Sequence, residues 1–218
     1  HARKTELKSF DTATGKTQWS KSGASELVGA TESELIMFDP PSGRVYGISR
    51  ANQSVLWEDY LRFSAGIGDG VVHNGTAYVW NSQGQFVAYD TATNQRKWKY
   101  RHFNSRVIVK PVESNDTVFV VFYDDRSGTS EVHAFNKSSG NQKWMKSYSN
   151  ISTQKPHWKH YTLGILGPNL FVNDRVLDPV TGRSKATLPE NFHTATSSGI
   201  ITSNESVAYI PASRLPEE

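Results

Sequence analysis

A nine-residue phrase recurs along the chain and constrains its fold more than any other feature. Each copy begins with a small polar residue that favours a tight turn, and four of the five copies end on a tryptophan. The copies are Asp11–Trp19, Ser49–Trp57, Asp90–Trp98, Asn136–Trp144 and Asp178–Ala186, with alanine in place of the last tryptophan. Their end positions are 38, 41, 46 and 42 residues apart. A period near 40 with strand-like flanks is typical of the four-stranded blade of a β-propeller.

The segments around each copy read as strands. In the third repeat, the residues 66–73, 76–80, 86–89 and 95–100 are separated by turn residues and carry the apolar patterns of strands buried between neighbouring sheets. The strand nearest the propeller axis is expected at 27–31, 66–73, 107–112, 162–166 and 196–202. The repeated tryptophans then lie on outer strands, and we expect them to be buried against the next blade.

The order of strands along the chain predicts how the ring closes. The chain starts with the outer pair of a blade (residues 5–21) and ends with an inner pair (194–213), between complete blades at 26–59, 66–100, 107–146 and 161–188. Pairing of Leu7–Lys21 with Ser198–Pro211 would complete a fifth blade and remove the exposed sheet edges. We therefore expect residues 1–218 to form one all-β domain, a closed five-bladed propeller; a fragment of a longer array is the alternative.

Composition excludes several classes of function. The formal net charge is only +3, and no run of Lys or Arg forms a basic stripe, so a nucleic-acid partner is not expected. No apolar run approaches the roughly 18 residues that a membrane-spanning helix needs. The absence of cysteine excludes disulfides, thiolate metal sites and cysteine nucleophiles.

Asparagine context favours a secreted or surface location, or the lumen of the secretory pathway. Six triplets match the acceptor pattern for N-linked glycosylation, which exceeds the roughly two or three expected by chance. Their asparagines are Asn52, Asn74, Asn115, Asn136, Asn150 and Asn204. The alternative is that Asn, Ser and Thr simply crowd into turns. The up-and-down order of four strands places five of these six asparagines on one face of the propeller.

The opposite face, made of blade-to-blade connections, carries aromatic, Arg and His residues that suit recognition. The predicted ligand-binding residues are Tyr60, Arg62, Phe63, Arg101, His102, Phe103, His157, Trp158, His160 and His193. The alternative is that these rings fold inward and seal the blades. His157, His160, His102 and His193 could bind zinc or copper, but they lie in loops, where no strand or helix holds them at a fixed spacing, so we expect no metal.

The repeated motif resembles the pyrroloquinoline-quinone-type repeat, which occurs in quinoprotein dehydrogenases and in many non-enzymatic propellers. Luminal domains of endoplasmic-reticulum stress sensors and outer-membrane assembly propellers are similar in type. The chain lacks the vicinal cysteine pair of many such dehydrogenases and has no evident cluster of calcium ligands. On the inner strands only Asp69 is central, whereas a glycosidase needs two facing carboxylates. We therefore expect a non-enzymatic member without a cofactor.

The resulting expectation is a binding module that receives a protein or carbohydrate partner on its connection face. Two other classes stay open. One is a structural subunit of an extracellular assembly or filament, formed by self-association. The other is an enzyme, either a quinone-dependent dehydrogenase or a glycosidase.

Overall fold

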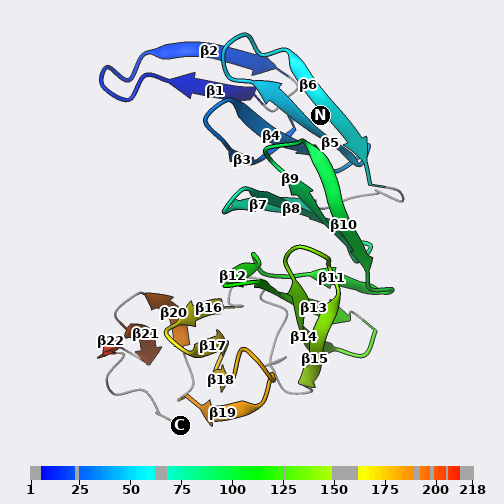
Figure 1. Cartoon of the computed structure of the whole chain (residues 1–218). Coiled ribbons are helices and arrows are strands. Elements are labelled where there is room, and N and C mark those ends of the chain that lie inside the picture. Colours follow the sequence, from blue (N-terminus) through cyan, green and yellow to red (C-terminus); the bar gives the residue numbers. More distant parts are fainter. Residues whose placement is uncertain are drawn as a thin grey trace.

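A computed structural model describes residues 6–22, 25–61, 68–124, 126–148, 162–188, 192–196, 199–204 and 206–211. All regular elements in these ranges are β-strands, and all pairings between them are antiparallel. The sheets follow one another in chain order and form a curved array (Figure 1). Nowhere in the described ranges does a helix have the length and hydrophobicity needed to cross a bilayer.

Four sheets correspond to blades. The first contains β3 (Glu26–Ala30), β4 (Glu34–Asp39), β5 (Arg44–Ser49) and β6 (Val55–Tyr60). The second contains β7 (Gly68–His73), β8 (Thr76–Asn81), β9 (Gln85–Asp90) and β10 (Gln95–Arg101). The third contains β11 (Ser105–Val107), β12 (Val112–Ser114), β13 (Thr117–Asp124), β14 (Thr129–Asn136) and β15 (Gln142–Tyr148). The fourth contains β16 (Leu163–Leu166), β17 (Asn169–Val172), β18 (Arg175–Leu177) and β19 (Ser184–Thr187).

Two smaller sheets lie at the ends of the chain. The hairpin of β1 (Glu6–Phe10) and β2 (Thr17–Ser22) is a separate two-stranded sheet. The C-terminal sheet contains β20 (Phe192–Thr196), β21 (Gly199–Asn204) and β22 (Ser206–Pro211).

The apolar core lies between successive blades. Every residue of β8 is buried, because its side chains point alternately toward the first and the third blade. Between the second and third blades, Tyr78, Phe86, Trp98, Phe122 and Phe135 form one aromatic cluster. Stacked sheets buried on both faces explain why the central strands read as continuous apolar runs.

The repeated tryptophan of one blade is received by the turn of the next. Trp98 Nε1 donates to the Lys137 carbonyl at 2.8 Å, and Trp144 Nε1 donates to the Pro179 carbonyl at 3.0 Å. A Cβ at Gly140 would lie 2.5 Å from Trp98, and one at Gly182 would lie 2.7 Å from Trp144. Glycine is therefore required in this turn for two reasons: it adopts the positive φ of the turn, and it leaves space for the tryptophan ring.

The predicted burial of the tryptophans is confirmed most fully for Trp98, which is 7% exposed. Trp57 and Trp144 are partly buried against inter-blade clusters. Trp57 differs from the other two because its Nε1 donates to Glu34 Oε2 at 2.8 Å. Trp19, on the terminal hairpin, is half-buried.

The predicted ring closure is not formed among the described residues. The hairpin β1–β2 lies at one end of the array and β20–β22 at the other, with no pairing between them (Figure 1). Leu7 packs instead with Met37, Tyr46 and Ile48 of the first blade. The hairpin thus buries its apolar side chain against the sheet that follows it in sequence, and the described sheets form an open array.

Two inner strands also differ from prediction. Residues 192–196 form a first strand in the C-terminal sheet, beside β16, so 199–204 is the second strand rather than the inner one. The predicted strand 107–112 is divided into β11 and β12, both of which pair with β13. Pro111 precedes β12, and its missing N–H cannot contribute a ladder hydrogen bond at the break.

Candidate binding surface

The two ends of the blades differ in chemistry. We call the end with the first-to-second and third-to-fourth turns the turn face, and the opposite end, where the chain passes to the next blade, the connection face. In the second blade Gly68 lies opposite Asn81 and Gln85 lies opposite Arg101, so these four residues mark the connection face. The up-and-down order inferred from the sequence is present in all four blades.

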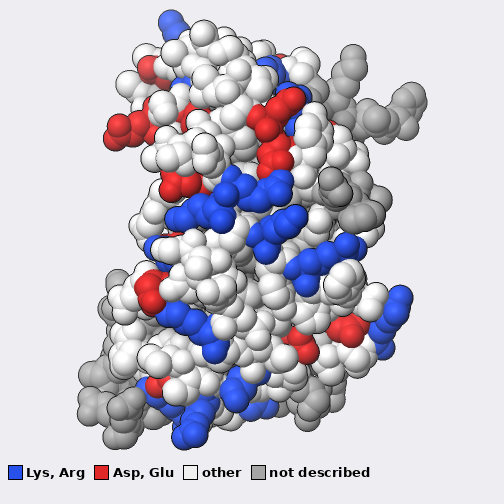
Figure 2. Space-filling model, turned by 45° about the vertical axis from the view of Figure 1, so that its right-hand side comes forward, with Lys and Arg blue, Asp and Glu red and all other residues white. Residues whose placement is uncertain are grey.

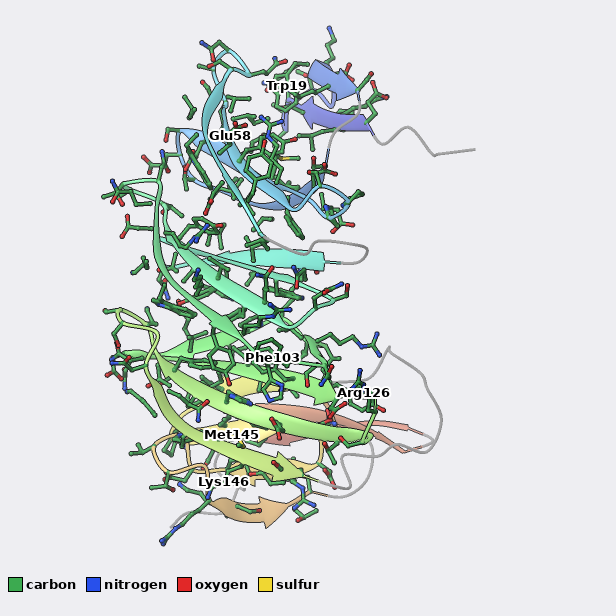
Figure 3. All side chains as sticks on the ribbon, turned by 90° about the vertical axis from the view of Figure 1, so that its right-hand side faces the viewer. Trp19, Glu58, Phe103, Arg126, Met145 and Lys146 are labelled. Atoms are coloured by element: carbon green, nitrogen blue, oxygen red, sulfur yellow. The ribbon has the colours of Figure 1, made fainter. Side chains whose placement is uncertain are left out.

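Four of the predicted ligand-binding residues lie in the described ranges: Tyr60, Arg101, His102 and Phe103. Phe103 is 66% exposed and Tyr60 is 50% exposed, so both aromatic side chains face solvent. The Arg101 guanidinium lies 4.5 Å from the centre of the Phe103 ring, which is the geometry of a cation–π contact. Phe103 projects where the second and third blades meet (Figure 3).

The remaining predicted ligand-binding residues lie outside the described part of the chain. They are Arg62, Phe63, His157, Trp158, His160 and the side chain of His193.

A cavity of about 290 Å³ lies between the second and third blades at the connection face. It is lined by the end of β8 with the turn that follows, by the start of β7, and by residues 106–110 after the connection. Asp69, Arg106 and Lys110 supply charged groups to a wall that otherwise includes Trp80. Sequence reasoning did not find this cavity, because its lining comes from three separate segments.

The inner strands also bring Glu26 of β3 close to Asp69 of β7. Partial burial, and next the charge of Asp69, raise the pKa of Glu26 above its ordinary value. Asp69 is therefore not the isolated central carboxylate that the sequence predicted.

Basic side chains collect over the middle of the molecule (Figure 2). The outer strand β10 alone carries four of them, in the sequence Gln95–Arg101. Arg96 of this strand is paired with Asp59 of the first blade.

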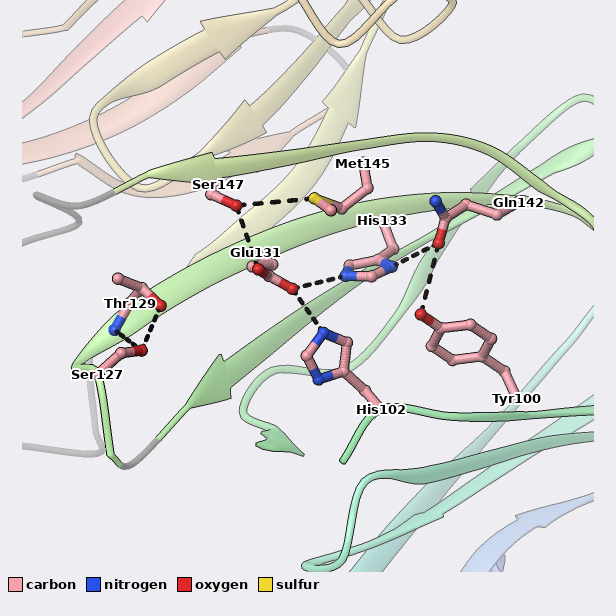
Figure 4. Close-up of polar contacts among 9 residues, drawn as sticks. All are labelled: Tyr100, His102, Ser127, Thr129, Glu131, His133, Gln142, Met145 and Ser147. Atoms are coloured by element: carbon pink, nitrogen blue, oxygen red, sulfur yellow. Dashed lines mark hydrogen bonds and ion pairs between the residues drawn. The ribbon is translucent and has the colours of Figure 1, made fainter. Parts of the chain in front are cut away.

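His102, unlike Phe103, folds inward. Its ring stacks on Phe122 at a centroid distance of 5.3 Å, and its Nε2 lies 2.6 Å from Glu131 Oε2 (Figure 4). His102 therefore packs between the blades, which was the alternative to a ligand-binding role.

The same carboxylate oxygen, Glu131 Oε2, also lies 3.2 Å from Nε2 of His133. The His133 side chain is only 1% exposed, and its Nδ1 lies 3.1 Å from Gln142 Oε1. Burial lowers the pKa of His133, and this outweighs the opposing effect of the hydrogen bond to Glu131. The sequence signal was the spacing Glu131-Val-His133, which places both side chains on one face of a strand.

The turn face carries Asn52, Asn74, Asn115 and Asn136. Asn52, Asn74 and Asn115 are exposed, whereas Asn136 is half-buried. Within the first triplet Asn52 Oδ1 accepts a hydrogen bond from the Ser54 hydroxyl at 2.8 Å.

The other two triplets do not add to this face. Asn204 was predicted in a first-to-second turn but ends β21, the second strand of its sheet, so it lies at the opposite end of that sheet. Asn150 is outside the described ranges.

Stacked antiparallel sheets, with Trp98 and Trp144 each received by the turn of the following blade, define a repeat protein of the β-propeller class. Residues 3–160 match the family model PQQ_2, described as outer membrane protein assembly factor BamB, and the chain belongs to this family. This confirms the resemblance to pyrroloquinoline-quinone-type repeats. No curated protein matches the chain.

Of the solved structures that resemble the chain, a designed protein supports the fold. The computationally designed Ika8 protein is 13% identical, with a TM-score of 0.68 over 97% of this chain and 67% of that one. BamB from Moraxella catarrhalis is 15% identical, with a TM-score of 0.49 over 96% and 74%. A europium-containing methanol dehydrogenase is 17% identical, with a TM-score of 0.48, and the chain spans 29% of its length.

Proposed function

We propose that the chain is a non-enzymatic binding module that receives a protein partner on its connection face. The observation that carries the proposal is the exposed Phe103 ring, with the half-buried Arg101 stacked on it, on the face that also holds a cavity between two blades. An exposed aromatic ring stacked with an arginine is the kind of side-chain pair that dominates binding energy at protein interfaces. Membership of a family described by an assembly factor is in keeping with a protein partner.

The surroundings of Phe103 favour a partner with apolar and acidic groups. The ring would supply apolar area, and Arg101 is already stacked on it, so little side-chain entropy is lost on binding. Lys99 and Arg101, toward the connection-face end of β10, would complement carboxylates on the partner and increase the rate of encounter. A polar surface of this kind also suits a transient rather than an obligate complex.

The test compares two exposed apolar residues on opposite faces. Phe103→Ser removes the aromatic ring from the connection face, whereas Val180→Ser alters a side chain that is 78% exposed in the turn between β18 and β19, on the turn face. Both variants should keep the wild-type melting temperature, because neither side chain is buried.

Each protein would be immobilised and incubated with the extracellular and luminal fraction of the cells that produce it. A partner should be retained by wild type and Val180→Ser, with its affinity reduced at least about fivefold by Phe103→Ser. Equal retention by all three proteins would refute the role of the connection face. Concentration-dependent self-association of the wild type, in place of a partner, would support the assembly subunit instead.

We further propose that the protein is a glycoprotein located outside the cytoplasm, with glycans on the turn face. Exposure of Asn52, Asn74 and Asn115 supports this, since an acceptor asparagine must be accessible. A mobile glycan on the turn face would direct large partners to the connection face. Intact mass before and after peptide N-glycosidase treatment tests the proposal, and an unchanged mass after expression in a glycosylating host would refute it.

A further inference from the structure

We propose that His102, Glu131 and His133 form a binding site for a divalent transition-metal ion, best suited to Zn²⁺. One ligand atom from each residue lies within 4.8 Å of the others. Two imidazole nitrogens and one carboxylate oxygen are a common zinc ligand set, which leaves a fourth position open. The site is distinct from the proposed partner-binding residue Phe103, although His102 precedes it directly.

The separations of the ligand atoms suit a small ion. Zinc ligands at about 2.0–2.2 Å from the metal in a tetrahedron lie roughly 3.3 Å from one another. His133 Nε2 and Glu131 Oε2 are 3.2 Å apart, so this pair already has the required spacing. His102 Nε2 is 2.6 Å from the same oxygen and would move outward slightly to admit the ion. His102 belongs to the connection after β10, which leaves it more room to adjust than a residue in the middle of a sheet.

The outer hydrogen bonds orient two of the ligands. Gln142 Oε1 faces both His133 Nδ1 at 3.1 Å and the Tyr100 hydroxyl at 3.5 Å, so the amide oxygen is placed to accept from the imidazole N–H (Figure 4). With the proton on Nδ1, His133 would present the lone pair of Nε2 to an ion bound beside Glu131. Ser147 Oγ donates to the other Glu131 oxygen at 3.1 Å. Partners of this kind hold ligating histidines and carboxylates in metal sites.

Without an ion, His133 Nε2 and Glu131 Oε2 are close enough for a hydrogen bond, at 3.2 Å, and the His133 side chain is almost fully buried. An ion held by His102 Nε2, His133 Nε2 and Glu131 Oε2 would take the place of the proton in this contact, because a ligating imidazole nitrogen must be unprotonated.

The site is reachable from solvent. The side chains of His102 and Glu131 are 22% and 20% exposed, which is enough for an ion to enter and for water to occupy the fourth position. His102 comes from the connection after β10, whereas Glu131 and His133 come from β14 of the third blade. A bound ion would therefore tie the connection to the third blade and restrict the segment that carries Phe103.

The experiment titrates the chelator-treated full chain with ZnCl₂ by calorimetry and with CoCl₂ by visible absorption. Wild type should bind one equivalent, show the d–d bands of a nitrogen- and oxygen-ligated Co²⁺ ion, and melt at a higher temperature when zinc is present. His102→Gln and Glu131→Gln should each weaken binding at least about tenfold. His73→Gln is the matched control, because His73 contacts the Pro111 carbonyl on the inner side of the second blade, away from the cluster.

Several outcomes would overturn the proposal. Absence of stoichiometric binding by the wild type is one. Equal affinity of the wild type and both cluster variants is another, since the ion would then bind elsewhere. If Glu131→Gln fails to fold, His102→Gln decides the result, because His102 lies in a connection and its removal leaves the sheet pairings intact.

Discussion

Adding a single methyl group at Gly140 would probe how adjacent blades are joined. Gly140 closes the turn after β14 with φ +70°, and a Cβ there would lie 2.5 Å from Trp98 Cγ. An L-residue in this left-handed conformation costs about 1–2 kcal/mol. Forcing the Trp98 ring aside costs about 1–3 kcal/mol more. Gly140→Ala should therefore lower the free energy of unfolding by about 2–5 kcal/mol.

Gly128 is the matched control in the same sheet. It closes the turn after β13 with φ +69°, and the nearest atom to an added Cβ is the Tyr123 hydroxyl at 3.9 Å. Gly128→Ala should cost only the backbone strain, about 1–2 kcal/mol. Because both variants share the turn conformation, the difference between them isolates the contact with the tryptophan.

Urea unfolding, followed by circular dichroism, measures both costs. The midpoint for Gly140→Ala should fall further than that for Gly128→Ala, at unchanged m-value. In a Trp98→Ala background the added cost of Gly140→Ala should drop to that of the control, because the ring is gone. Equal destabilisation of the two glycine variants in the wild-type background would refute the argument that the turn receives the ring.

Two further predictions concern buried polar groups. Burial acts to raise the pKa of Glu113, but hydrogen bonds from Lys137, Tyr78 and Asn74 outweigh it and hold the pKa below its ordinary value of 4.5. This stabilisation is present above that value and lost as pH falls through the lowered pKa. Glu113→Gln should then destabilise by about 1–3 kcal/mol at pH 7, and in urea unfolding at a series of pH values this difference should shrink as pH falls through the lowered pKa; a constant difference would contradict this. Trp144→Phe removes the 3.0 Å donation to the Pro179 carbonyl and should cost about 1–2 kcal/mol, as measured by urea unfolding.

The sequence predicted several residues of the candidate surface, but not which of them face solvent and which pack inward. Phe103 and His102 are adjacent and both were expected to face a ligand. Phe103 is exposed, whereas His102 stacks on Phe122 and contacts Glu131. The direction of each loop side chain depends on which neighbouring sheet it can contact. The local sequence does not specify that sheet, so it cannot predict the direction.

The ligands of the proposed metal site could not be predicted from the sequence either. Of the loop histidines, His102 belongs to the cluster with Glu131 and His133. His157, His160 and the side chain of His193 lie outside the described residues. Glu131 and His133 lie 29 and 31 residues beyond His102 in sequence. They approach it because the third blade stacks on the second, which is a contact between sheets rather than within one.

The sequence by itself determined the repeat period, the strand-and-turn order within a blade, and the role of the tryptophans as contacts between blades. These follow from local chemistry: turn residues end strands, and apolar residues buried on both faces require sheets on either side. Tertiary structure alone decided that the terminal strands remain apart, that Gly140 and Gly182 receive the tryptophan rings, and that His102 meets Glu131 and His133. Each of these depends on how one sheet rotates and stacks on the next, a geometry set by side-chain packing across the interface and not by the pattern within either strand.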